Sequence, residues 1–95
     1  MANVYEEDAR GKQAVDLLEN SLFREAVDTL RQSLVDKWLS SPVRDIEGQH
    51  ELRLMTKLLG DIEMYIANIA KTGKMAAIQL EQEQKVEKLR KFGIR

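Results

Sequence analysis

The strongest pattern in the chain is the stretch LRLMTKLLGDIEMYIANI, residues 52–69. Its apolar side chains recur at alternating spacings of three and four residues, at positions 52, 55, 59, 62, 66 and 69. This heptad spacing places the apolar side chains along one face of an α-helix. The stretch therefore predicts a long amphipathic helix whose apolar seam packs against another helix, as in a coiled coil.

A second apolar pattern lies upstream and also has spacings of three or four residues. Its members are Phe23, Val27, Leu30, Leu34 and Trp38. This pattern predicts an amphipathic helix over residues 21–40, preceded by a shorter helix over residues 6–19. The residues leave open whether these are two helices or one bent helix, although Asn20 and Ser21 are residue types that cap a second helix.

Pro42 separates the two long apolar patterns. Proline lacks a backbone donor and disfavours helical backbone at the preceding residue, so the first helix should end near Ser40. Asp45 is then well placed to cap the next helix. Because a connection of about five residues joins neighbouring antiparallel helices, the sequence predicts an antiparallel helical hairpin.

Gly73 marks a second predicted boundary. Glycine readily adopts the left-handed backbone that ends many helices, so we expect a long helix over residues 45–72 and a C-terminal helix over residues 74–92. A lone glycine also fits inside a longer helix, at a cost of about 1 kcal/mol. The predicted fold is thus one all-α domain over residues 1–95: a hairpin with a heptad-like core, a short N-terminal helix and a C-terminal helix.

The two arms of this predicted hairpin differ in length. At 1.5 Å per residue, the helix over 21–40 spans about 30 Å and the helix over 45–72 about 42 Å. The longer arm therefore overhangs near Tyr65–Ile69. The short N-terminal helix, the C-terminal helix or another subunit must cover this end, so a homo-oligomer or another protein partner is a hypothesis. We interpret Trp38 as a core residue, with an exposed interface anchor as the alternative. The interface candidates are Trp38, Tyr65, Ile66, Ile69 and Phe92.

Length and composition limit the class of protein further. A chain of 95 residues forms one domain at most, and 43% hydrophobic with 33% charged residues is typical of a globular or coiled-coil chain. There is no cysteine for a disulfide or a thiolate metal site. The acidic start does not resemble a signal peptide, and no apolar run reaches 18 residues. These features favour an intracellular protein.

No set of residues predicts catalysis or a metal site. The single histidine, His50, forms one Glu47-x-x-His50 unit, whereas helical di-iron sites need two such units and further glutamates. Leu54 occupies the position of the second histidine in the zinc-protease pattern. The serines lack a triad and the single glycines form no phosphate-binding loop. We therefore expect no enzyme activity, no cofactor and no metal. A di-metal helical bundle, formed by symmetric assembly of several copies, is a third alternative.

Charge is unevenly distributed along the chain. The first 40 residues contain five basic and eight acidic side chains, whereas the last 22 contain six basic and three acidic ones. Clustered cations bind nucleic-acid phosphates, but cations at the end of a helix also stabilise its dipole, and Glu87 interrupts the cluster. Nucleic-acid binding is therefore an alternative function. The candidate phosphate contacts are Lys85, Lys88, Arg90, Lys91 and Arg95.

The order of boundary patterns gives the chain a resemblance to a known class. These patterns are Trp38-Leu39-x-x-Pro42, Arg44-Asp45-x-Glu47-Gly48-x-x-Glu51, Thr72-Gly73-Lys74-Met75-Ala76 and Phe92-Gly93. Over residues 20–93 the chain resembles small helical proteins encoded by tailed bacteriophages, often among the head and DNA-packaging genes. The resemblance implies a structural or assembly role in the virion, with the chain in the host cytoplasm or the virion. It also implies a phage structural component as partner, and it carries over no catalytic residue.

Overall fold

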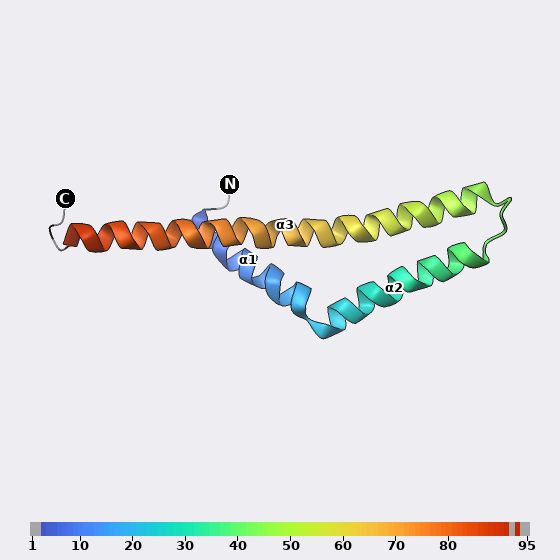
Figure 1. Ribbon diagram of the computed structural model, residues 1–95, viewed down its shortest axis with the longest axis horizontal. Coiled ribbons are helices and arrows are strands. Elements are labelled where there is room, and N and C mark those ends of the chain that lie inside the picture. The colour runs from blue at the N-terminus through green and yellow to red at the C-terminus, as the bar shows by residue number, and fades with distance from the viewer. Residues whose placement is uncertain (1–2, 92, 94–95) are drawn as a thin grey trace. The chain divides into compact units, whose positions relative to one another are not determined.

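The computed structural model describes residues 3–91 and residue 93, and within them it contains three α-helices and no strand (Figure 1). The helices are α1 (Val4–Glu19), α2 (Ser21–Ser40) and α3 (Ile46–Lys91). The predicted all-α class is therefore confirmed.

The described residues group into two compact units, each treated by itself below. Unit 1 combines residues from 1–16 and 67–95, and unit 2 covers residues 17–66. α3 contributes residues to both units. That the two units form the single domain expected from the chain length stays a prediction.

Each helix begins at a polar side chain that accepts a hydrogen bond from the first turn. The Oδ1 atoms of Asn3, Asn20 and Asp45 accept from the third following backbone N–H, at 2.9, 2.9 and 3.0 Å. These bonds satisfy donors that the helix itself leaves free. Since Asn20 has extended backbone, with φ −65° and ψ 122°, α1 and α2 are separate helices. α2 coincides with the predicted range, and α1 begins two residues before the predicted start at residue 6.

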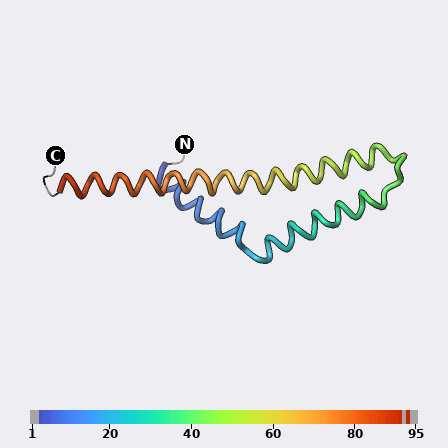
Figure 2. The backbone as a smooth tube through the Cα atoms, viewed as in Figure 1, coloured from blue at the N-terminus to red at the C-terminus, as the bar shows by residue number. Residues whose placement is uncertain are grey.

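The segment between α2 and α3 is short (Figure 2), and hydrogen bonds connect it to both helices. Ser41, the residue before proline, has the extended backbone that proline imposes, with φ −71° and ψ 144°. Its N–H donates to the Trp38 carbonyl at 3.2 Å. The Gln49 amide nitrogen donates to the Pro42 carbonyl at 3.0 Å, which ties the segment to the first turn of α3.

The cap at Asp45 gives a direct test of how α3 begins. We expect Asp45→Ala to lower the free energy of unfolding by about 1 kcal/mol, because the Gly48 N–H loses its acceptor. Thermal unfolding followed by circular dichroism measures the change. Arg44→Ala is the matched control at the neighbouring exposed position, and it should have almost no effect. If both variants lose the same free energy of unfolding, then Asp45 does not stabilise α3 as a cap.

α3 runs without interruption through Gly73 (Figure 1). The predicted break between a helix over 45–72 and a helix over 74–92 is therefore wrong. Gly73 does not adopt the left-handed backbone; among the described glycines only Gly93 does, with φ 69°, just beyond the end of α3. Good helix formers on both sides of Gly73 offset its low helix propensity. Phe92, the last residue of the predicted C-terminal helix, lies outside the described residues.

In unit 1, α1 and α3 meet backbone to backbone at two glycines. A Cβ atom added to Gly11 would lie 2.5 Å from the Gly73 Cα atom, and one added to Gly73 would meet the Gly11 Cα atom and lie 2.9 Å from the Glu7 carbonyl oxygen. Gly11, Gly73, Ala14 and Ala76 are all buried. The absence of side-chain volume on both helices is thus what allows this contact.

In unit 2, α2 packs on residues 46–66 of α3 through a thin core. Val27 is the only residue of α2 that is buried, at 6% exposure. Arg31 of α2 forms an ion pair and hydrogen bond with Glu63 of α3, and both side chains are partly exposed. Along α3, half-buried Leu52, Leu59 and Ile66 recur every seven residues. Only one side of the heptad seam is therefore sheltered.

Candidate functional site

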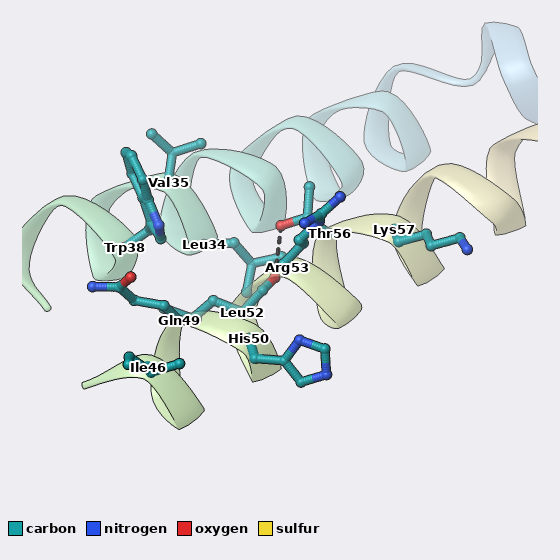
Figure 3. A pocket seen from close by; sticks show the side chains of 10 residues that line it. All are labelled: Leu34, Val35, Trp38, Ile46, Gln49, His50, Leu52, Arg53, Thr56 and Lys57. Carbon is teal, nitrogen blue, oxygen red and sulfur yellow. Dashed lines mark hydrogen bonds between the residues drawn. The ribbon is translucent and has the colours of Figure 1, made fainter. Parts of the chain in front are cut away.

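An apolar groove lies between the two helices of unit 2 and has a volume of about 820 Å³ (Figure 3). We call it the α2–α3 groove. Its lining residues are Leu34, Val35 and Trp38 from α2, and Ile46, Gln49, His50, Leu52, Arg53, Thr56 and Lys57 from α3.

Apart from His50, the polar side chains of the groove are either hydrogen-bonded within the chain or cationic. The Thr56 hydroxyl donates to the Leu52 carbonyl at 2.9 Å, and Gln49 donates to the Pro42 carbonyl. Arg53 and Lys57 remain, and neither has a carboxylate within 4.0 Å among the described residues. The α2–α3 groove thus combines apolar surface with cationic side chains contributed by α3.

Trp38 lines this groove with 53% of its surface exposed. The interpretation of Trp38 as a core residue is therefore wrong. The amphipathic pattern correctly indicates which face of α2 is apolar, but the facing part of α3 does not cover the indole. The alternative interpretation, an interface anchor, stays a prediction.

His50 also lines the groove, and its side chain is exposed. In Figure 3 its imidazole extends away from the Trp38 indole. Within residues 3–91 and Gly93, no three His, Cys, Asp or Glu side chains are grouped so that they could hold a metal ion.

A second apolar surface follows α3 within unit 2, and we call it the α3 stripe. It consists of Met55, Leu58, Ile62 and Tyr65. These side chains are between 50% and 64% exposed, although each is large and apolar in character. Their spacings of three and four residues place them on one continuous face of the helix. The stripe includes the two seam positions, Met55 and Ile62, that the chain itself leaves uncovered.

Only some of the apolar side chains at the predicted overhang near Tyr65–Ile69 are exposed. Tyr65 is exposed and belongs to the α3 stripe, whereas Ile66 and Ile69 are half-buried. Sequence reasoning placed the uncovered surface at one end of the long arm. The structure instead shows exposed apolar side chains well before that end, at Leu54, Met55 and Leu58, because α2 shelters only one side of the seam.

The buried glycines were missed as a packing site by sequence reasoning. A usable signal was present, since Gly11 and Ala14 have the same spacing of three as Gly73 and Ala76. Small residues at such spacing let two helix backbones approach closely.

The predicted phosphate contacts Lys85, Lys88, Arg90 and Lys91 are exposed in the last turns of α3. Lys85 pairs with Glu81 one turn earlier, at 3.5 Å. Arg95 lies outside the described residues.

Comparison with protein-family models, with curated proteins and with solved structures finds no match to this chain. No helix within the described residues combines the length and the apolar character that a membrane span requires.

Proposed function

We propose that this chain is a non-enzymatic structural or assembly protein that acts through helix–helix contacts with other protein chains. The observation that carries the proposal is the α3 stripe, a regular apolar helix face whose side chains are each at least half exposed. Large contiguous apolar surfaces of this kind are typical of protein interaction sites. The half-exposed Trp38 in the neighbouring groove adds support, since tryptophan is enriched among residues that dominate binding energy.

The architecture that we propose for unit 2 is an antiparallel helical hairpin with a heptad-like core. The ion pair between Arg31 and Glu63, which connects α2 to α3, supports this arrangement. So does the half-buried series Leu52, Leu59 and Ile66, which repeats with the heptad period. In a hairpin of this kind, one apolar face of α3 packs against α2, and a second face of α3 remains available to a partner.

The partner class that we propose is a structural component of a phage head or packaging apparatus, together with further copies of the chain. The resemblance to small helical phage proteins motivates this choice, through the boundary patterns around Pro42, Asp45 and Gly73. The structure adds a physical reason for a protein partner, because an exposed apolar helix face is stabilised when another helix covers it.

Substitution at the centre of the α3 stripe tests the proposal. We expect the chain to co-sediment with virions or head-assembly intermediates from the native producer, and Ile62→Lys to reduce this association at least tenfold. A lysine at this position places a charge in the apolar contact. Glu83→Lys is the matched control, because it adds a cation at an exposed position of α3 outside the stripe.

Two results would contradict this prediction in different ways. If Ile62→Lys and the unchanged chain co-sediment equally, then the stripe does not make the contact. If the unchanged chain stays in the free fraction, then the assembly role itself is wrong.

The alternative function is a small nucleic-acid-associated packaging or regulatory protein. The exposed cations Lys85, Lys88, Arg90 and Lys91 at the end of α3 favour it. Phosphate contacts of this kind weaken steeply as salt concentration rises. A gel-shift assay with double-stranded DNA at low salt separates the two functions, since absence of binding removes this alternative.

A further inference from the structure

We propose that copies of this chain associate head to tail, with the α3 stripe of one copy seated in the α2–α3 groove of the next. The inference rests on the proposed function and names the partner of the groove as a second copy of the chain. Both surfaces belong to unit 2, and they differ in charge and in position around α3.

The groove carries positive charge. Arg53 and Lys57 line it, and no carboxylate of a described residue is among the lining groups. The neighbours of Arg53 on the helix surface, three and four residues away, are Gln49, His50, Thr56 and Lys57. None of these is acidic, so the positive charge of Arg53 is not neutralised locally.

The α3 stripe is flanked by negative charge. Glu51 lies four residues before Met55, and Asp61 lies three residues after Leu58 and four before Tyr65, so both adjoin the stripe on the helix surface. Both carboxylates are exposed. Glu51 has no cation three or four residues away, since those positions hold Glu47, Gly48, Leu54 and Met55, whereas Asp61 has Lys57 four residues before it. The stripe is therefore an apolar face with acidic edges.

Charge therefore favours pairing of the α3 stripe with the α2–α3 groove over a symmetric pairing of two grooves or of two stripes. Two grooves facing each other would bring Arg53 and Lys57 against their own copies, and two stripes would do the same with Glu51 and Asp61. Like charges placed across an interface disfavour it, whereas opposite charges favour it and fix its orientation. The stripe in the groove also brings apolar surface against apolar surface.

The two surfaces also lie on opposite sides of α3, except that Lys57 and Asp61, four residues apart, adjoin each other at their border. Arg53 in the groove and Met55 in the stripe are two residues apart, which is a rotation of about 200° around the helix. One copy is therefore able to contact a second through its groove and a third through its stripe at the same time. An interface that joins two different surfaces repeats from copy to copy, and it produces a closed ring or an open filament.

Charge reversal tests this pairing with two variants. The groove variant carries Arg53→Glu and Lys57→Glu, and the stripe variant carries Glu51→Lys and Asp61→Lys. In sedimentation velocity over a concentration series, the unchanged chain should form species larger than a dimer. Each variant alone should show roughly a hundredfold weaker self-association, because its two surfaces now carry the same charge.

An equimolar mixture of the two variants should associate again. In the mixture the acidic stripe of the groove variant meets the unchanged groove of the stripe variant, and the reversed surfaces are also complementary. If the interface is symmetric, the mixture should contain no species larger than a dimer. Lys88→Glu with Arg90→Glu is the matched control, because it makes the same charge change outside both surfaces and should leave self-association intact.

Salt dependence gives a second measurement on the unchanged chain, which decides the matter if circular dichroism shows that a variant has lost its helices. Self-association should weaken as ionic strength rises, because the paired charges are solvent-accessible. A strict monomer, an assembly that stops at a dimer, association that salt leaves unchanged, or a mixture that fails to recover each overturns the inference. A monomer that still co-sediments with virions overturns head-to-tail pairing and leaves the proposed contact with a phage structural component standing.

Discussion

Replacing Gly73 by alanine is expected to lower the free energy of unfolding of unit 1 by roughly 2 kcal/mol, although alanine is the better helix former. The added methyl group meets the Gly11 Cα atom and the Glu7 carbonyl oxygen, which are backbone atoms of α1 and cannot rotate away. α1 should therefore separate from α3. A free helix of 16 residues is marginal in water, so its backbone amides should exchange with solvent much faster.

Hydrogen exchange measured over residues 4–16 detects this separation. Gly60→Ala is a closely matched control, because Gly60 lies in the same helix and an added Cβ atom would meet nothing within 4 Å. There the higher helix propensity of alanine acts alone, so stability should increase by roughly 0.5–1 kcal/mol. If the two substitutions change stability in the same direction, the close contact of α1 with α3 does not exist in solution.

Val27→Asp should produce a loss of similar or larger size in unit 2, of roughly 3 kcal/mol. Val27 is 6% exposed, and a carboxyl group at this position would be buried without a hydrogen-bond or ion-pair partner. Because the buried core of α2 consists of this residue, we expect α2 to lose its packing on α3 as a whole.

Urea unfolding followed by tryptophan fluorescence measures the change, since Trp38 is the single tryptophan and lines the α2–α3 groove. The control is Leu22→Asp in the first turn of α2, where the side chain is 71% exposed and an acidic group interacts favourably with the helix dipole. A loss of stability in Leu22→Asp equal to that in Val27→Asp would contradict the assignment of Val27 as the core of unit 2.

Local signals in the sequence were sufficient to predict the helix class and the boundary around Pro42. Proline fixes its own backbone and that of Ser41, and Asp45 bonds within three residues of itself, so both effects are complete within a few positions. Heptad spacing likewise identifies the apolar face of α3, because helix geometry alone decides which side chains share a face.

The features that the sequence could not predict depend on contacts between residues that lie far apart along the chain. A lone glycine is compatible with the end of a helix and with close packing, and only the approach of Gly11 selects the second at Gly73. Periodicity shows that Trp38 and Met55 lie on apolar faces, but it does not show how much of each face the chain itself covers. The α2–α3 groove and the α3 stripe are both consequences of that incomplete cover.

The contact of Gly11 with Gly73 has a consequence for the evolution of the chain. Each glycine is restricted by backbone atoms of the other helix and not by a side chain. A larger residue at one position therefore cannot be compensated by a smaller residue at the other, because neither has any side chain left to remove. Among homologues that keep this crossing, the two positions should be invariant, and statistical covariation would find no signal for one of the closest contacts in unit 1.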